Sequence, residues 1–153
     1  MPLKKEVEDK GYTQLKQDLK TGQLCTVYVF HGEETYLREY YLDQLRKKLI
    51  PAGFEEFNYH KLEGKALSVQ ALSDIVEALP MMCEKTLVTV TDFDLFKLNE
   101  EQRGQLIALL SDFPDYCCLV FVYDLIEYKA DARTKLAAAI KEHGTVANFV
   151  RQD

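Results

Sequence analysis

Five short apolar segments alternate with longer amphipathic segments along this chain. The apolar segments are rich in valine, phenylalanine and tyrosine, residues that favour the buried positions of a β-sheet. They are "LCTVYVF" (24–30), "FNYHKL" (57–62), "TLVTVT" (86–91), "CCLVFVY" (117–123) and "TVANF" (145–149). One helical pattern precedes the first segment and one separates each following pair. This alternation predicts a three-layer α/β domain, in which a five-stranded parallel sheet has helices on both faces.

The predicted helices begin and end at residues that suit those positions. A helix over 69–79 has Ser68 as its N-cap, and Pro80 would stop it. A later helix begins after Asn99, and the last one ends at Gly144. In the helix after the first strand, the apolar stripe consists of Leu37, Tyr41, Leu45 and Leu49.

Length, composition and charge restrict the classes of function. The 153 residues are 47% hydrophobic and 29% charged, which is typical of one soluble globular domain. A net charge of -6 argues against strong unaided binding to nucleic-acid phosphates. No apolar run is long enough to span a bilayer. The four cysteines form no C-x-x-C pair, so we expect buried, reduced thiols in a cytosolic protein.

The segment "VYVFHGEETYLREYYLDQL" (27–45) predicts a strand, a glycine-containing loop and a helix. Nucleoside triphosphatases hold phosphates in such a loop, using backbone N–H groups and a lysine. Here the lysine and the hydroxyl residue are missing, and Glu33 and Glu34 stand at the start of the helix. Carboxylates there satisfy the helix dipole and repel a triphosphate, and Glu33 could serve as a cap. The sequence therefore predicts that no nucleotide binds.

Carboxylates at the ends of the predicted strands leave two alternative functions open, one enzymatic and one in signalling. A Toprim-like Mg²⁺ site for nucleic-acid chemistry would use Glu33 or Glu34 with Asp92 and Asp94. However, the glutamate–glycine order is reversed, and no cluster of basic catalytic residues accompanies these acids. A receiver-like signalling module would use Glu33, Glu34 and Asp92, but 123–124 and 149–150 lack the required hydroxyl residue and lysine. The simplest interpretation is that these acids solvate the strand ends.

Histidine and cysteine patterns do not predict a metal cofactor. His31, His60 and His143 lie far apart in the sequence, without the spacing of metal ligands. Cys117 and Cys118 alternate across one predicted strand, so they should face opposite layers of the domain.

Two consecutive methionines stand out in "SDIVEALPMMCEKTLVTV" (73–90). Met81 and Met82 follow Pro80 on a short connection, and polar residues begin the next strand. Methionine is adaptable and is over-used at binding surfaces. Local sequence leaves two hypotheses open: the methionines bind a partner, or they fill the end of their own sheet.

Three segments, in their order and spacing, resemble one protein family. They are "VYVFHGEETYLREYYLDQL" (27–45), "EALPMMCEKTLVTVTDFD" (77–94) and "DARTKLAAAIKEHGTVANF" (131–149). From about Leu15 to Phe149 the chain resembles the N-terminal domain of the DNA polymerase III delta subunit family of bacterial clamp loaders. The resemblance implies a RecA/AAA+-like module without a functional phosphate loop, which agrees with the first loop of this sequence.

The resemblance also implies a binding site. In the family, the connection between the second helix and the third strand carries a hydrophobic pair, commonly leucine and phenylalanine, which enters a pocket on the sliding clamp. Met81 and Met82 occupy the matching positions; they keep the apolar bulk but lack the aromatic ring. Leu79 and Pro80 would shape this wedge. The rim of the site would come from the preceding helix, at Gln70, Ser73, Asp74 and Glu77.

The activity implied by the resemblance is mechanical. The chain would bind and open the sliding clamp (beta subunit) for loading onto primed DNA during replication, in the bacterial cytoplasm. It would be a non-catalytic part of the DNA polymerase III holoenzyme, a DNA-directed DNA polymerase and nucleotidyltransferase, and would need no cofactor. In the full-length protein, its further partners would be the gamma/tau and delta prime subunits and primer–template DNA, with no membrane partner.

The family continues into lid and collar domains. Residues 1–153 are therefore expected to be a single clamp-binding domain, the N-terminal part of a longer subunit. Because the collar assembles the loader in the family, this piece should not join the other subunits by that route.

Overall fold

A computed structural model describes residues 2–131 and 134–150, with side chains from Lys10 onwards. The alternation of strands and helices predicted from the sequence is present. The elements are α1 (Pro2–Thr21), β1 (Val27–His31), α2 (Thr35–Leu49), α3 (Glu55–Asn58), β2 (Tyr59–Glu63), α4 (Val69–Glu77), β3 (Thr86–Thr91), α5 (Glu100–Ser111), β4 (Cys117–Val122), α6 (Lys135–His143) and β5 (Thr145–Asn148). Short 3-10 turns follow β2 at Gly64–Ala66 and β3 at Leu95–Lys97.

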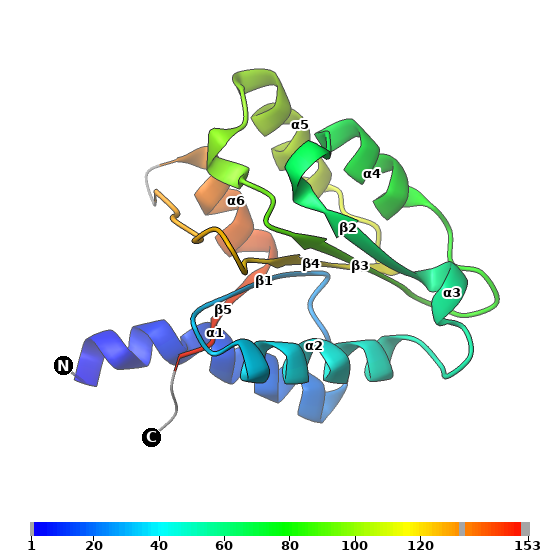
Figure 1. Ribbon diagram of the computed structural model, residues 1–153, viewed down its shortest axis with the longest axis horizontal. Coiled ribbons are helices and arrows are strands. Elements are labelled where there is room, and N and C mark those ends of the chain that lie inside the picture. Colours follow the sequence, from blue (N-terminus) through cyan, green and yellow to red (C-terminus); the bar gives the residue numbers. More distant parts are fainter. Residues whose placement is uncertain (1, 132–133, 151–153) are drawn as a thin grey trace.

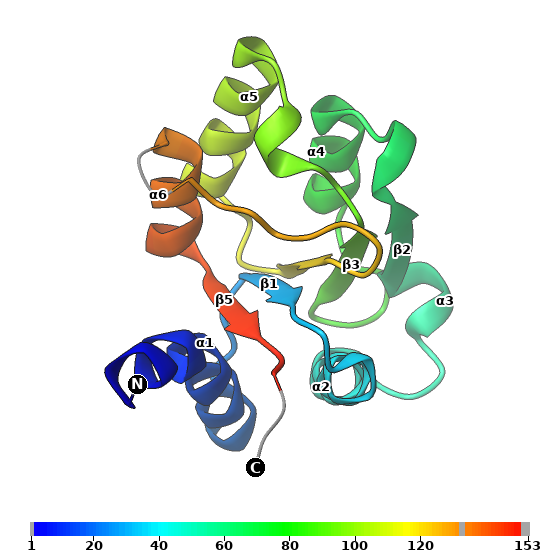
Figure 2. The same ribbon diagram turned by 60° about the vertical axis from the view of Figure 1, so that its left-hand side comes forward.

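The five strands form one parallel sheet in the order β2-β3-β4-β1-β5. Strand β1 lies between β4 and β5, with Tyr28 aligned with Val120 on one side and Thr145 on the other. Helices α1 and α2 cover one face, and α4, α5 and α6 cover the other (Figures 1 and 2). The predicted three-layer fold class is confirmed.

Alternating side chains of the strands build two separate cores. In β1, Val27 and Val29 pack in the core under α4, α5 and α6, whereas Tyr28 and Phe30 pack in the core under α1 and α2. Cys117 and Cys118 divide between the two cores in the same way, as their alternation predicted. Residues buried on both faces explain why these strands are continuous apolar runs in the sequence.

The first strand begins at Val27 and not at Leu24, and two further boundaries that differ from the prediction lie near the methionine pair. The strand predicted over 57–62 is wrong at its start, because Phe57 and Asn58 complete the short helix α3. The side-chain amide of Asn58 donates to the Phe54 carbonyl at 2.8 Å, which stabilises that helical turn. The helix predicted over 69–79 ends at Glu77 instead.

One hydrogen bond and one proline account for this earlier end of α4. The Tyr116 hydroxyl donates to the Glu77 carbonyl, where the next helical turn would otherwise bond. Pro80 in turn disfavours helical geometry at the residue before it. Ala78 is already extended, with φ -63° and ψ 134°. Leu79 therefore belongs to the connection and not to the helix.

The cysteines are free, but they are less buried as a group than predicted. Cys117 and Cys118 are buried, and burial raises the pKa of the Cys117 thiol to about 11. Cys25 and Cys83 are only half-buried, which corrects the expectation for those two. Both lie just outside strands, where the sheet no longer covers them.

Candidate functional site

The carboxyl ends of the strands form the edge at which related folds bind ligands. In this chain that edge is filled by its own side chains, above all by Arg38 from α2. The Arg38 guanidinium is 2% exposed and donates to the carbonyls of Tyr123 at 2.9 Å and Gly32 at 3.3 Å. Its other terminal nitrogen pairs with the Asp124 carboxylate at 2.7 Å. Arg38 thus joins the glycine loop after β1 to the segment after β4.

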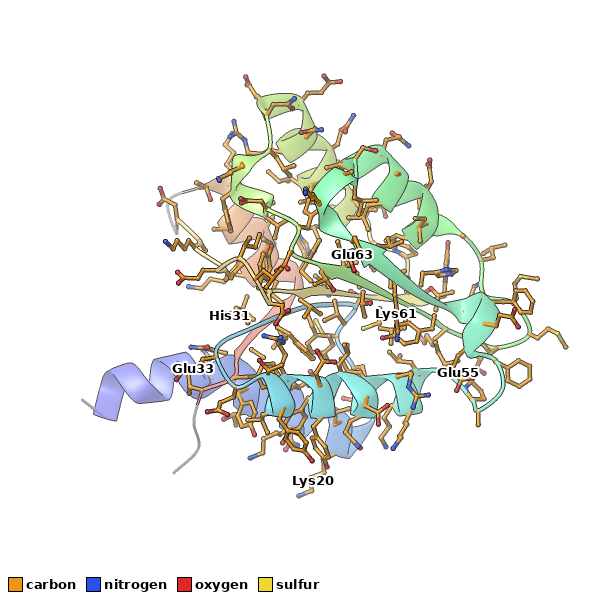
Figure 3. All side chains as sticks on the ribbon, in the orientation of Figure 1. Lys20, His31, Glu33, Glu55, Lys61 and Glu63 are labelled. Atoms are coloured by element: carbon orange, nitrogen blue, oxygen red, sulfur yellow. The ribbon has the colours of Figure 1, made fainter. Side chains whose placement is uncertain are left out.

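Aromatic rings close the same edge above β1 and β4. The Tyr128 ring lies 5.1 Å from His31, 5.3 Å from Tyr123 and 5.6 Å from Phe96, measured between ring centroids. Desolvation lowers the pKa of His31 to about 4, so this imidazole is neutral at neutral pH. His31 and Glu33 are labelled at this end of the molecule in Figure 3. Neutral, packed rings at this edge offer no charge that would attract a triphosphate.

The acids predicted at this edge have structural contacts. Asp92 has a φ of 58°, and its carboxylate accepts hydrogen bonds from the backbone N–H groups of Asp124, Leu125 and Ile126 at 2.8–3.3 Å. Asp94 faces Lys97 at 3.6 Å. Within residues 2–131 and 134–150, no group of three or more His, Cys, Asp or Glu side chains could hold a metal ion, so these acids do not form a ligand set with Glu33.

The proposed cap at the start of α2 is wrong in its detail. Glu34, and not Glu33, is the N-cap residue, and its side chain makes no capping hydrogen bond. Instead, its backbone N–H donates to the Phe149 carbonyl at 3.0 Å, which ties the glycine loop to the end of β5. The loop is held by its main chain and by Arg38.

We predict that this edge does not bind nucleotide. Mixing the chain with Mg-ATP in a calorimeter should give no heat above dilution, because Arg38 and the aromatic cluster around Tyr128 occupy the edge and the glycine loop carries no phosphate-binding lysine. A phosphate-loop ATPase measured under the same conditions provides the positive control. Micromolar binding of Mg-ATP to the chain would contradict this account of the edge.

The methionine pair lies at the opposite, amino-terminal end of the strands. Here the methionine turn, residues 79–83, connects α4 to β3, and α3 lies beside it at the end marked by Glu55 in Figure 3. Met81 is 54% exposed and Met82 is 87% exposed, and Leu79 is also exposed. The hypothesis that the two methionines fill the end of their own sheet is therefore wrong.

The methionine turn is tied to the body of the domain on both sides. Asn58 hydrogen-bonds to both backbone groups of Met81, at 2.7 and 2.9 Å. After the turn, the Lys85 ammonium donates to the Asp115 carbonyl at 2.6 Å. A groove of about 720 Å³ runs from Met82 along the amino ends of β1 and β4. The turn therefore projects apolar side chains from a fixed base beside an open groove.

The rim residues predicted on α4 are not all close to the methionine turn. Glu77 ends α4 directly before the turn, whereas Gln70 lies near the start of the helix. Gln70, Ser73 and Glu77 line a separate groove of about 290 Å³ between α4 and α5. Asp74 is exposed and accepts a hydrogen bond from Gln70 at 2.9 Å. Of the four, Glu77 is the one placed next to the turn in the chain.

Comparison with known proteins assigns the family. A family model described as DNA polymerase III, delta subunit, matches residues 28–150. The chain belongs to the delta subunit family. Among curated proteins, the DNA polymerase III subunit delta of Bacillus subtilis is 31% identical over an alignment of 134 residues that covers 83% of this chain and 38% of that protein. The chain thus spans about two fifths of the length of this delta subunit relative.

Solved structures share the fold of this delta-family domain. The Bacillus subtilis DNA clamp loader delta protein has a TM-score of 0.75 and 23% identity, over 90% of this chain and 42% of that one. A DNA polymerase III gamma subunit-related protein of Thermotoga maritima has a TM-score of 0.59 and 13% identity, over 92% and 47%. A RuvB mutant of Thermotoga maritima reaches 0.51 and 12%, over 88% and 42%. The fold is therefore AAA+-like.

Sequence reasoning missed three residues of the two edges in this delta-family domain. Arg38 lies on a helix whose pattern predicts solvent exposure for an arginine, and two of its three partners are 85 and 86 positions away. The pattern predicts a strand at Asn58. Its partner Met81 is 23 positions away, so no local signal indicates their hydrogen bonds. Phe57, exposed on α3 next to Asn58, was assigned to the same strand. The only local signal for Phe57 and Asn58 was their own position, at the start of the segment 57–62, which is otherwise weakly apolar for a strand.

Met82 holds an uncommon backbone conformation for a long side chain. Its φ is 64°, in the left-handed region, where a β-carbon costs about 1–2 kcal/mol. Glycine has no such cost, although it gains freedom in the unfolded chain. We therefore expect Met82→Gly to be more stable than Met82→Ala by about 1 kcal/mol in chemical denaturation. A glycine variant that is the less stable of the two would show that the turn does not keep this conformation in solution.

Proposed function

We propose that this chain is the clamp-binding module of a bacterial clamp loader, and that Met81 and Met82 enter an apolar pocket on the sliding clamp. The observation that supports this most directly is the exposure of both methionines on a turn that the domain holds in place. The matching positions carry the hydrophobic pair in the family that the chain resembles. Burying two such side chains contributes about 1.5–3 kcal/mol each before the costs of association.

The mechanism that we propose is mechanical and makes or breaks no covalent bond. The methionine turn anchors the domain in the clamp, and α4, which ends directly before the turn, presses on the ring so that one interface opens. Arg38 and the aromatic cluster around Tyr128 keep the opposite edge of the sheet closed, so the domain itself would not respond to ATP. Nucleotide-dependent control would come from neighbouring loader subunits.

The wider setting of the module is part of the same proposal. In the longer subunit, the partners would be the clamp, the gamma/tau and delta prime subunits and primer–template DNA. The chain would be a non-catalytic part of the polymerase holoenzyme, acting in the bacterial cytoplasm. None of the described helices is long and apolar enough to cross a membrane. The Toprim-like alternative loses its support because backbone N–H groups occupy the Asp92 carboxylate.

The test is binding of the chain to a purified bacterial sliding clamp, measured by biolayer interferometry in EDTA without nucleotide. We expect saturable binding whose dissociation constant does not change when EDTA is replaced by Mg-ATP. Both alternatives from the sequence require Mg²⁺, so a strict requirement for the metal would favour them. No binding to clamps from several bacteria would contradict the proposal.

A further inference from the structure

We infer that Asn58 is the positioning residue that holds the methionine turn in its binding conformation, an inference that rests on the proposed function. Asn58 is fully buried, although it is polar, and its side chain lies at the end of α3. It does not belong to the methionine turn. Its effect on a partner would be exerted through the backbone of Met81.

The amide of Asn58 uses both of its polar atoms on the turn. Its oxygen accepts from the Met81 N–H at 2.7 Å, and its nitrogen donates to the Met81 carbonyl at 2.9 Å. The same nitrogen donates to the Phe54 carbonyl at 2.8 Å, which fixes the amide relative to α3. The side chain thus pairs with Met81 as a neighbouring strand would, in a place that no strand reaches.

The chemistry requires an amide of this length. An aspartate keeps the acceptor for the Met81 N–H, but it has no donor for the two carbonyls. A leucine has the same branched skeleton but neither polar group, and a glutamine is longer by one methylene. Buried polar atoms that lose such partners are costly, so the three hydrogen bonds form or fail together.

The position of the pairing explains why the turn depends on it. Tyr116 holds the chain before the turn, at Glu77, and Lys85 holds it after the turn. Between these anchors the exposed side chains of Leu79, Met81 and Met82 bury little surface that could fix the backbone. Without Asn58 the turn would populate other conformations, and the apparent affinity for the clamp would be multiplied by the fraction of molecules that remains competent.

The experiment compares wild type with Asn58→Leu and with Asn58→Ala, well below the melting temperature of each variant. We expect the dissociation constant for the sliding clamp to rise about tenfold or more in both. The matched control is Asn99→Ala, which removes the cap of α5, a hydrogen bond of 2.8 Å to the Gln102 N–H, at the other end of the sheet. This control should lower the melting temperature but change the dissociation constant by less than about twofold.

Two further readouts separate positioning from simple stabilisation. In the free protein, the Met81 amide should exchange its hydrogen faster in Asn58→Leu than in wild type, whereas amides of β4 should keep their protection. In a background of Met81→Ala with Met82→Ala, Asn58→Leu should cause little further loss of clamp affinity, because it acts through the methionines.

The outcomes distinguish the inference from the function on which it rests. If the wild-type chain does not bind the clamp, the proposed function fails and the inference fails with it. If binding depends on both methionines but changes less than twofold in folded Asn58 variants, only the inference is overturned. Unchanged exchange at the Met81 amide would overturn it as well.

Discussion

Replacing Met81 and Met82 together by alanine should weaken binding to a bacterial sliding clamp by about 2–5 kcal/mol, the range of a central hot spot. That corresponds to a dissociation constant about 30-fold to several thousand-fold higher. Both side chains are exposed in the free domain, so a partner can desolvate them, and their truncation leaves no cavity in the core. The melting temperature should therefore change by only a degree or two, measured by circular dichroism on the same sample.

The chain offers a matched control for this double substitution. Leu125 is 88% exposed, like Met82, but it follows β4 at the opposite edge of the sheet. Leu125→Ala removes a comparable exposed apolar side chain and should leave clamp affinity unchanged. A double methionine variant that melts at a much lower temperature, yet binds the clamp with wild-type affinity, would refute the hypothesis that the two methionines enter the clamp.

Removing the Asp124 carboxylate should destabilise the domain by about 2–4 kcal/mol, because Asp124→Ala leaves the buried Arg38 guanidinium without its counter-charge. Asp124 itself is 47% exposed, so in Arg38→Met its carboxylate turns to water and no buried charge is left unpaired. Arg38→Met should therefore lower stability less than Asp124→Ala does. The double variant should be close to Arg38→Met alone. Urea denaturation of the three variants measures these differences.

A surface ion pair provides the comparison for this prediction. Asp43 pairs with Arg46 at 2.8 Å on α2, with both side chains partly exposed. Removing such a pair typically changes stability by 1 kcal/mol or less. If Asp124→Ala is as mild as Asp43→Ala, the Arg38 pair does not hold the two loops together as described.

The strands could be predicted because burial on both faces leaves a strong local pattern. The run 117–122 is apolar at every position, and 86–91 consists of valine, leucine and threonine, which favour strands, so the type and order of these elements follow from the sequence. The position of the methionine connection could also be predicted, since Pro80 stands before it and the polar pair Glu84 and Lys85 after it, but local sequence left the exposure of Met81 and Met82 open. These signals all lie within a few residues of the feature that they predict.

The polar contacts that complete both edges could not be predicted, because they join distant positions. Nothing near Asn58 indicates that its amide pairs with Met81, and nothing near Arg38 indicates that it is buried against Asp124. The four-residue helix α3 is too short to show a helical period. Such contacts depend on how the elements pack, and the sheet order decides that packing.

The most direct test of the central claim observes the two methionines while the clamp binds. The chain has three methionines, and two of them form the turn, so ¹³C labelling of methionine ε-methyl groups gives a simple NMR spectrum. Single substitutions Met81→Leu and Met82→Leu assign the signals. On addition of unlabelled sliding clamp, we predict that the Met81 and Met82 methyl signals shift and broaden as they leave solvent. A complex that forms while both signals stay unchanged would contradict the account.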